Sequence, residues 1–345
     1  MSKINVLAQV ANKNNGVYYH RIINPFNYML GDFEIQFADG LITYEQLEWA
    51  NVLVISRALD NPPSVTREWC DKYNIKIILD IDDLPHLPDY HFYKETIFTD
   101  YYVGYLQIAD QVWVTNKQLY DYAIQHNSKV EIIPNGLPFG YDQFKENNIK
   151  FNMGRKAFMY SANLTHYKDI EVMKGAIKAV NKQPIFQKFT FCLLGKFKSK
   201  VASDNKAWEK IEDVFKGGKK NNTSYLSIPI KGVTEYMYSV GLGSIGLAPL
   251  IDDEFNRCKS NLKILEYASK NMPCIISGVS SQLTSNPPCI IAKTTKEWEE
   301  AFMYYMKDES RIVEDGEKLN KWAKNNFDIK QTNYKRIKSI NKLFV

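Results

Sequence analysis

The stretch that decides the fold reads IGLAPLIDDEFNRCKSNLKILEYASKNMPCIISGV and spans residues 245–279. It opens with an apolar run that ends at Pro249, as expected for a parallel strand covered on both faces. A polar loop follows, then a helical pattern that starts near Ser260, then the short apolar run PCIIS at 273–277. A strand, a helix and a strand in this order form the unit of a doubly wound parallel sheet.

The same alternation continues on both sides of this unit and fills the second half of the chain. Its expected strands are short and rich in β-branched or aromatic residues. They cover 157–161, 189–195, 224–228, 243–250, 273–277 and 289–292. The helical patterns between them cover 168–182, 233–240, 259–270 and 294–307, and a charged helical stretch occupies 308–343. This half therefore predicts a Rossmann-like domain.

The first half of the chain shows the same pattern of apolar runs and helical segments. Its expected strands are 4–10, 33–38, 51–56, 75–80, 111–115 and 130–134. Its clearest helical segments are 64–73, 92–108 and 116–126. The pattern stops at 136–156, a polar stretch with glycines and a proline, which we interpret as the domain linker.

We therefore predict an α/β protein with two doubly wound parallel sheets that face a cleft. The N-terminal domain covers 1–150, the C-terminal domain covers 151–325, and a C-terminal helix at 326–345 packs back on the first domain. A length of 345 residues suits two domains. In such sheets a ligand binds outside the carboxyl ends of the strands, so we searched for functional residues directly after strands.

Composition narrows the class of protein and its partners. Hydrophobic residues make up 45% and charged residues 24%, as in ordinary globular proteins. A net charge of +5 permits an anionic ligand but lacks the stronger bias of most nucleic-acid-binding proteins. The five cysteines show no CxxC spacing, which argues against a zinc site and a disulfide framework. With no signal peptide and no apolar stretch of about 20 residues, we expect a cytoplasmic protein without an integral membrane segment.

The strongest candidate site is the start of the helix in the quoted stretch. Lys259, Ser260, Asn261 and Lys263 lie there, and a helix N-terminus with nearby lysines suits a phosphate group. Glu266 shares a helix face with Lys263 and can accept hydrogen bonds from the hydroxyls of a ribose. The alternative is a capped, charged surface helix, because serine caps are common.

Candidate residues in the first domain follow its strands. Gly16 allows a ligand to approach the backbone closely, or else marks a simple turn. His20 and Arg21 open the next helix, where an arginine is poorly placed for the helix dipole and could instead meet an anion in the cleft. Arg57 and His86 also lie near strand ends, and either could contact a sugar.

Three aspartates follow the fourth strand, in the stretch ILDIDDLPHLP at 78–88. Asp80, Asp82 and Asp83 could hold a metal ion, since carboxylates are ligands for magnesium. Repulsion among three close carboxylates instead favours pairing with Arg57 or Arg21. We expect no bound metal.

At this point the sequence resembles the retaining glycosyltransferases of the GT-B fold, in particular those similar to glycosyltransferase family 4. The quoted stretch is similar to their donor-binding block, and the resemblance implies that Ser260 and Lys263 hold the diphosphate and Glu266 binds the ribose. Many members carry a loop glutamate where this chain has Cys258, and Glu254 is the nearest carboxylate. The resemblance makes Lys168, Lys263 and Glu254 the candidate catalytic residues.

Other segments resemble the same family in order and spacing. VEIIPNGLP at 130–138 is similar to the end of its first domain, and ADQVWVTNKQLYDYAI at 109–124 to the strand and helix before it. AFMYSANLTHYKDI at 157–170 is similar to the loop where members place an arginine and a lysine against the diphosphate; here those positions hold Asn163 and Lys168. The resemblance also assigns further donor contacts, namely Gly16, Gly195, Ile230, Lys231, Pro249, Lys259 and Asn261.

The resemblance implies transfer of a sugar from a nucleoside-diphosphate sugar to an acceptor hydroxyl, with retention at the anomeric carbon. Among these donors we expect a UDP-sugar. The donor is a co-substrate, and no other cofactor is expected. The expected acceptor contacts are His20, Arg21, Arg57, Asp82, Asp83 and His86. Two alternatives stay open, namely a transferase acting on a modified DNA base and a GT-B protein that binds a nucleotide or sugar without turnover. For the main hypothesis, the sugar transferase, the expected acceptor is a glycan, a lipid-linked acceptor or a small molecule.

Overall fold

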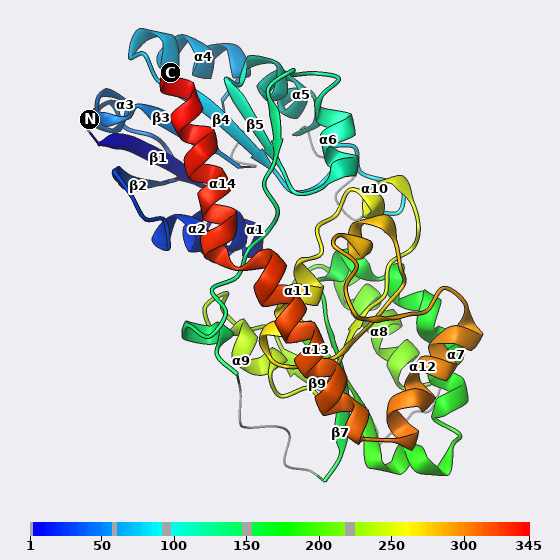
Figure 1. Ribbon diagram of the computed structural model, residues 1–345. Helices are drawn as coiled ribbons and strands as arrows, with labels where there is room; N and C mark the ends of the chain where they lie inside the picture. Colours follow the sequence, from blue (N-terminus) through cyan, green and yellow to red (C-terminus); the bar gives the residue numbers. More distant parts are fainter. Residues whose placement is uncertain (1–2, 57–60, 92–97, 147–153, 218–224) are drawn as a thin grey trace.

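The protein consists of two α/β domains, each built on a six-stranded parallel sheet (Figure 1). The computed structural model describes residues 3–56, 61–91, 98–146, 154–217 and 225–345. The strands of the first sheet are β1 (Ile4–Val10), β2 (Phe33–Asp39), β3 (Val52–Ile55), β4 (Lys76–Ile81), β5 (Gln111–Val114) and β6 (Val130–Ile132). Those of the second sheet are β7 (Lys156–Ser161), β8 (Phe189–Lys196), β9 (Tyr225–Pro229), β10 (Ile245–Ala248), β11 (Cys274–Ile276) and β12 (Ile290–Ile291). All twelve expected strands are thus confirmed within a few residues.

The strand orders locate the switch point of each sheet. The first sheet has the order β2-β1-β3-β4-β5-β6, so the direction of winding changes between β1 and β3. The second has the order β12-β11-β10-β7-β8-β9, so its switch lies between β7 and β10. Ligands of open parallel sheets bind outside the carboxyl ends of the strands at such a point.

Helices cover both faces of each sheet. Those of the first domain are α1 (Gly16–Tyr18), the π-helix η1 (Tyr19–Ile23), α2 (Asn24–Asn27), α3 (Tyr44–Trp49), α4 (Pro63–Lys72), α5 (Phe98–Ile108) and α6 (Lys117–Ala123). Those of the second are η4 (Asp169–Met173), α7 (Lys174–Val180), α8 (Ala202–Phe215), α9 (Tyr236–Val240), α10 (Glu254–Arg257), α11 (Leu262–Ser269), α12 (Thr295–Lys307) and α13 (Ser310–Phe327). Helix α8 had no sequence prediction, although Trp208, Ile211 and Phe215 form its buried face at helical spacing.

The C-terminal stretch forms two helices, α13 and α14 (Ile329–Asn341), that run along the two domains in turn (Figure 1). At their junction Asp328 forms a parallel bridge with Leu137 of the linker, so the two chain crossings between the domains are hydrogen-bonded together. Helix α14 packs on the first domain, where Trp113 donates a hydrogen bond from Nε1 to Ser339 Oγ at 2.9 Å. Among the described helices, none has the length and apolar character needed to cross a bilayer.

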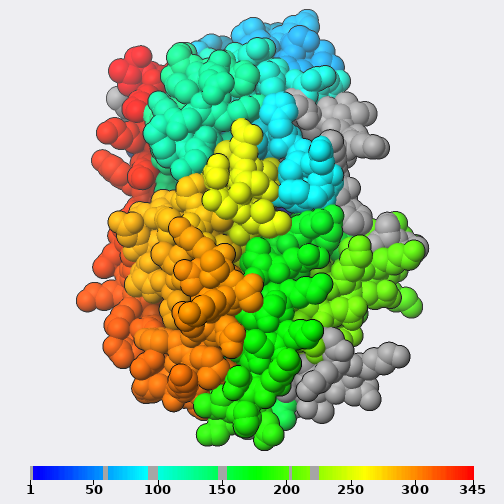
Figure 2. All heavy atoms as spheres, turned by 90° about the vertical axis from the view of Figure 1, so that its right-hand side faces the viewer, coloured from blue at the N-terminus to red at the C-terminus, as the bar shows by residue number. Residues whose placement is uncertain are grey.

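The two domains also touch on the face shown in Figure 2, where α10 and its flanking loops lie against the segment that follows β4. The hydroxyl of Tyr90 donates a hydrogen bond to Asp253, and His91 packs edge-on against Phe255 with ring centroids 5.3 Å apart. Phe255 and Cys258 join the hydrophobic cluster of the first domain. This contact covers one side of the space between the two sheets.

Candidate functional site

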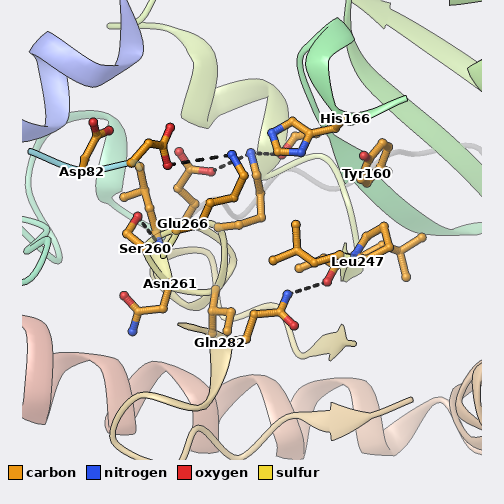
Figure 3. Close-up of a pocket in the computed structure, with 17 residues that line it drawn as sticks. Asp82, Tyr160, His166, Leu247, Ser260, Asn261, Glu266 and Gln282 are labelled. Atoms are coloured by element: carbon orange, nitrogen blue, oxygen red, sulfur yellow. Dashed lines mark hydrogen bonds and ion pairs between the residues drawn. The ribbon is translucent and has the colours of Figure 1, made fainter. Parts of the chain in front are cut away.

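A cavity of about 210 Å³ lies at the switch point of the second sheet, directly after β7 and β10. It is lined by the ends of these strands, the start of α11 and the loop after β4 of the first domain (Figure 3). The lining residues with polar side chains are Asp82, Asp83, Tyr160, Ser161, His166, Lys259, Ser260, Asn261, Lys263, Glu266 and Gln282. Both domains therefore contribute to one site.

Helix α11 presents its N-terminus to this cavity. Its N-cap residue, Asn261, makes no side-chain hydrogen bond to the first turn of the helix. Ser260 Oγ accepts one from the N–H of Leu262 at 3.4 Å and another from Asn135 Nδ2 of the first domain at 2.9 Å. A helix start offers further N–H donors and a partial positive charge, which together suit an anion.

Lys263 and Glu266 form the charged centre of the cavity. The ammonium group of Lys263 lies 3.1 Å from Ser161 Oγ, 3.0 Å from Tyr236 Oη and 3.3 Å from Glu266 Oε2. Burial disfavours the charged amine, but the attraction of Glu266 and the neighbouring tyrosines outweighs it and raises the pKa of Lys263 well above its usual value. The carboxylate of Glu266 is only 5% exposed, so Lys263 remains a cation beside a nearly buried anion.

His20 of the first domain reaches the same carboxylate. Its Nε2 lies 3.5 Å from Glu266 Oε1, and its side chain is 8% exposed. Burial lowers the pKa of His20 to about 4, although Glu266 acts in the opposite direction. The imidazole is therefore neutral at pH 7 and connects η1 to α11 across the domain boundary.

Lys259 and two of the predicted aspartates, Asp82 and Asp83, also line the cavity. The Lys259 ammonium group lies 3.9 Å from Asp83 Oδ1 and 4.5 Å from the centre of the Phe255 ring. Asn116 of the first domain donates hydrogen bonds to the backbone carbonyls of Cys258 and Lys259. The loop before α11 is thus held in place by the first domain.

His166 also lines the cavity, and sequence reasoning missed it. Its Nδ1 lies 2.8 Å from Asp169 Oδ2, and the carboxylate of Asp169 is 5% exposed. Figure 3 shows His166 and Glu266 on opposite sides of the same space. His166 follows β7 by five residues, so the rule that functional residues follow strand ends could have singled it out.

Several donor contacts assigned by the resemblance lie outside the cavity lining. The ammonium group of Lys168 lies over the ring of Tyr167, and Asn163 is exposed and accepts a hydrogen bond from the N–H of Leu164. Glu254 is exposed at the start of α10. Ile230 is 58% exposed and lines a separate cavity beside Trp208, and Lys231 is exposed as well.

The backbone conformation at position 195 explains why this residue is a glycine. Its backbone adopts φ +116°, which L side chains rarely adopt. A Cβ at this position would lie 2.4 Å from the carbonyl oxygen of Ala162. The glycine therefore lets β8 pass close to the loop after β7, and it lies outside the cavity lining.

Arg21, predicted to meet an anion in the cleft, is instead buried. Its guanidinium makes two hydrogen bonds to Asp80, at 2.8 and 2.7 Å, and further bonds to Ile133 O and Asn135 Oδ1. Arg21 is 1% exposed and Asp80 is fully buried, so this pair holds strand ends of the first sheet together. The three aspartates do not converge on one point, and no group of metal-ligating residues is found in the described part of the chain.

Two other first-domain candidates, His86 and Gly16, lie outside the cavity lining. His86 is exposed and pairs with the hydroxyl of Tyr122 at 3.2 Å. Gly16 is exposed at the start of α1, and a Cβ there would meet nothing within 4 Å. Arg57 lies outside the described residues. Of the acceptor contacts implied by the resemblance, Asp82 and Asp83 line the cavity and His20 contacts Glu266 in its lining.

Comparison with known proteins supports the fold. No family model matches the sequence, and a search of curated proteins found no match. Among solved structures, HepE of Anabaena in complex with UDP-glucose matches with a TM-score of 0.71 and 10% identity, over 98% of this chain and all of HepE. HepE has also been solved with UDP and with UDP and glucose.

Two sugar-phosphate synthases show the same likeness. Sucrose-phosphate synthase of Thermosynechococcus elongatus matches with a TM-score of 0.70 and 12% identity over 99% of both chains. A UDP-forming α,α-trehalose-phosphate synthase of Burkholderia xenovorans matches with a TM-score of 0.63 and 12% identity, over 86% of this chain and 75% of that one. At this low identity the likeness establishes the GT-B fold, with two Rossmann-like domains facing each other, as the sequence predicted.

Proposed function

We propose that this protein is a glycosyltransferase that transfers a sugar from a nucleoside-diphosphate sugar, UDP-sugar first, to an acceptor hydroxyl. One observation carries the proposal: the start of α11, Lys259, Lys263 and the nearly buried Glu266 converge at the switch point of a GT-B sheet. The complexes of HepE with UDP and UDP-glucose support this choice of donor.

Each group has a role that follows from its charge. The N–H groups of α11 and the lysines attract the diphosphate, and Glu266 accepts hydrogen bonds from ribose hydroxyls. When the bond from the anomeric carbon to the phosphate oxygen breaks, its electron pair stays on that oxygen. Fixed positive charge beside the oxygen then stabilises the leaving group. Lys263 retains its charge for this task because the nearby Glu266 carboxylate raises the pKa of Lys263.

Retention follows from the resemblance and is part of the proposal. The acceptor hydroxyl attacks the face from which the diphosphate departs, and its proton goes to the departing phosphate oxygen. The enzyme then needs no nucleophile of its own. Asp82 and Asp83, which reach the cavity from the first domain, are the groups available to orient the acceptor.

A ligand-binding screen tests the proposal. UDP, GDP and ADP, free and as sugar conjugates, are added with and without magnesium, and the unfolding temperature is followed. A ligand at a hundredfold excess over its dissociation constant stabilises the folded state by about 2.7 kcal/mol. We expect UDP and a UDP-sugar to raise the unfolding temperature independently of magnesium.

A matched pair of lysine variants makes the screen specific. Lys263→Met removes the charge beside Glu266, whereas Lys296→Met removes a charge from an exposed surface pair. We expect the UDP-induced shift to disappear in the first variant and to persist in the second. Equal shifts in both variants would place the nucleotide elsewhere and end the proposal.

Binding without turnover is the second candidate, and one observation favours it. Lys168, Glu254 and Asn163 do not line the cavity, and the family's loop glutamate is replaced by Cys258, whose thiol is buried. An assay that measures UDP release from a UDP-sugar over several hours decides between the transferase and the binding protein. Steady release in the presence of acceptors favours the transferase; tight binding with no release favours the binding protein.

A further inference from the structure

The pair His166 and Asp169 is built so that one imidazole nitrogen is fixed and the other is left for a ligand. The second oxygen of the Asp169 carboxylate accepts hydrogen bonds from Ile251 N and Asn256 Nδ2, each at 3.0 Å. Asp169 is therefore held as an acceptor from both sides, and His166 Nδ1 must donate its proton to it at 2.8 Å. This fixes the tautomer and leaves Nε2 without a proton in the neutral ring.

His166 Nε2 belongs to a ring that lines the cavity and is 25% exposed. Within the described part of the chain, the ring's only hydrogen bond to protein is the one to Asp169. The same cavity is lined by Lys259 and Lys263, with Glu266, Asp82 and Asp83 across it and the phenol of Tyr160 on β7. The charged groups near His166 are thus the cations of Lys259 and Lys263 and the carboxylate of Asp169. Three further carboxylates line the same cavity.

The protein's own groups favour the neutral form of His166. Burial lowers the pKa of His166, the hydrogen bond to Asp169 raises it, and the charges of Lys259 and Lys263 lower it again, with a net shift downward. A diphosphate at the start of α11 would reverse this balance, because its negative charge offsets the lysines and favours the imidazolium. The ring would then have a second N–H to donate.

We propose that His166 is a proton-accepting ligand of the donor's diphosphate, taking one proton from solvent as the diphosphate binds. This rests on the proposed function of the same cavity. In the bound state Nδ1–H donates to Asp169 and Nε2–H donates to a phosphate oxygen. The imidazolium supplies, on the loop after β7, the positive charge that the exposed Asn163 of that loop cannot supply. It stabilises the phosphate oxygen as the sugar departs.

Isothermal titration calorimetry tests the proton uptake directly. UDP is titrated into the parent protein at pH 7.5 in two buffers of different ionisation enthalpy, and the difference in heat counts the protons taken up. We expect uptake of about 0.5–1 proton by the parent and close to none by His166→Gln, since the β-phosphate of UDP is already largely ionised at this pH. His126→Gln replaces a histidine that packs against the Tyr122 ring, outside the cavity lining, and should behave as the parent.

The pH dependence of affinity gives a second readout. As pH rises from 6.5 to 8.5, the affinity of the parent for UDP should fall by up to about tenfold per pH unit, because the proton becomes harder to acquire. The affinity of His166→Gln should be nearly flat over the upper part of this range. A purely structural role for His166 would lower the unfolding temperature of the variant and leave the proton count unchanged.

A direct titration removes the dependence on a variant that folds poorly. The chain has five histidines, so the His166 Cε1–H resonance can be followed by NMR in the parent with and without UDP. We expect its midpoint to rise by at least one pH unit on binding. UDP binding with an unmoved midpoint, or equal proton uptake by parent and His166→Gln, overturns the inference alone. Failure of the parent to bind UDP or inorganic pyrophosphate overturns the proposed function and the inference with it.

Discussion

Both domains place an ion pair at the carboxyl ends of their strands, and the two pairs differ in one respect. In the first domain Arg21 and Asp80 are sealed from solvent, with every interaction supplied by the protein around them. In the second domain Lys263 and Glu266 line a cavity, and the lysine side chain is 34% exposed. Sequence reasoning placed both Arg21 and Lys263 in the cleft, because each lies near the start of a helix that follows a strand.

The difference teaches that position in the fold is not enough to make a charged residue functional. A buried charge whose hydrogen bonds are all satisfied serves structure, because it has no capacity left for a ligand. A charge beside a cavity and a helix N-terminus retains that capacity. The first pair should therefore control stability and the second should control ligand binding, and each of the following experiments tests one side of this contrast.

Arg21→Met should have the largest effect on stability. It leaves Asp80 buried without its partner, and breaking a buried pair in this way costs about 3–5 kcal/mol. Urea unfolding followed by circular dichroism measures the change. The double variant Arg21→Met/Asp80→Leu should recover only part of the loss, since it removes both charges but leaves the buried Arg336 without the attraction of Asp80. A single variant as stable as the parent would show that the sealed pair has no structural role.

His20 lies between the two regions and should make stability depend on acid. Its pKa is about 4 in the folded protein against an ordinary value of 6.5, because burial disfavours the charged ring. The unfolded chain therefore takes up the proton first as the pH falls. Stability from the neutral ring is complete above pH 6.5 and is lost as pH falls toward 4.

The size of this effect follows from the shift, at about 2–4 kcal/mol between pH 7 and pH 4. His20→Gln carries no titrating group and should lose less stability than the parent by about that amount over the same window. Unfolding free energies at pH 7, 5.5 and 4 give the comparison. Parallel losses in the two proteins would mean that His20 is not held neutral by the domain contact.

Glu266→Gln should weaken UDP binding by about 1–3 kcal/mol, the range for a hydrogen bond to a charged group. Calorimetric titration at pH 7.5 measures the affinity. Glu300→Gln, on α12 and exposed, is the matched control and should bind UDP as the parent does. Unchanged affinity in Glu266→Gln would show that the ribose is not bound at this carboxylate.

Gly16→Ala should have the smallest effect on stability, within about 0.5 kcal/mol. The added Cβ meets nothing within 4 Å, and the backbone there does not need a positive φ. Gly195→Ala gives the contrast and should cost about 1–3 kcal/mol, because it combines backbone strain with a clash against Ala162. Thermal unfolding ranks the two. A large loss for Gly16→Ala would indicate a structural turn and not an open approach for a ligand.

The sequence predicted the strands well because their signal is local. Apolar runs such as INVLAQV at 4–10 and FTFCLLG at 189–195 mark strands that are buried on both faces, whatever lies beside them. The start of α11 could also be predicted, since helix starts have local signatures. Helix α8 escaped because its apolar residues are spread over fourteen positions among charged ones.

The site was harder to predict because its members meet through contacts between distant residues. Glu266 contacts His20, which lies 246 residues earlier in the chain, and Ser260 accepts a hydrogen bond from Asn135 of the other domain. Lys168 and His166 lie two residues apart on one loop, yet only His166 lines the cavity. No periodicity tells which of the two side chains points inward, since the segment consists of two short 3-10 turns, Leu164–His166 and Asp169–Met173.

The sequence alone determined the two doubly wound sheets, the order of their strands along the chain and the position of the α11 start. Those features depend on hydrophobic period and helix-end chemistry, which act over a few residues. Only the tertiary structure decided which charges are sealed and which are open. Arg21 became structural because Asp80, Ile133 and Asn135 surround it, whereas Lys263 and His166 kept a face toward the cavity. Burial depends on what packs against a residue, and that is set by the whole fold.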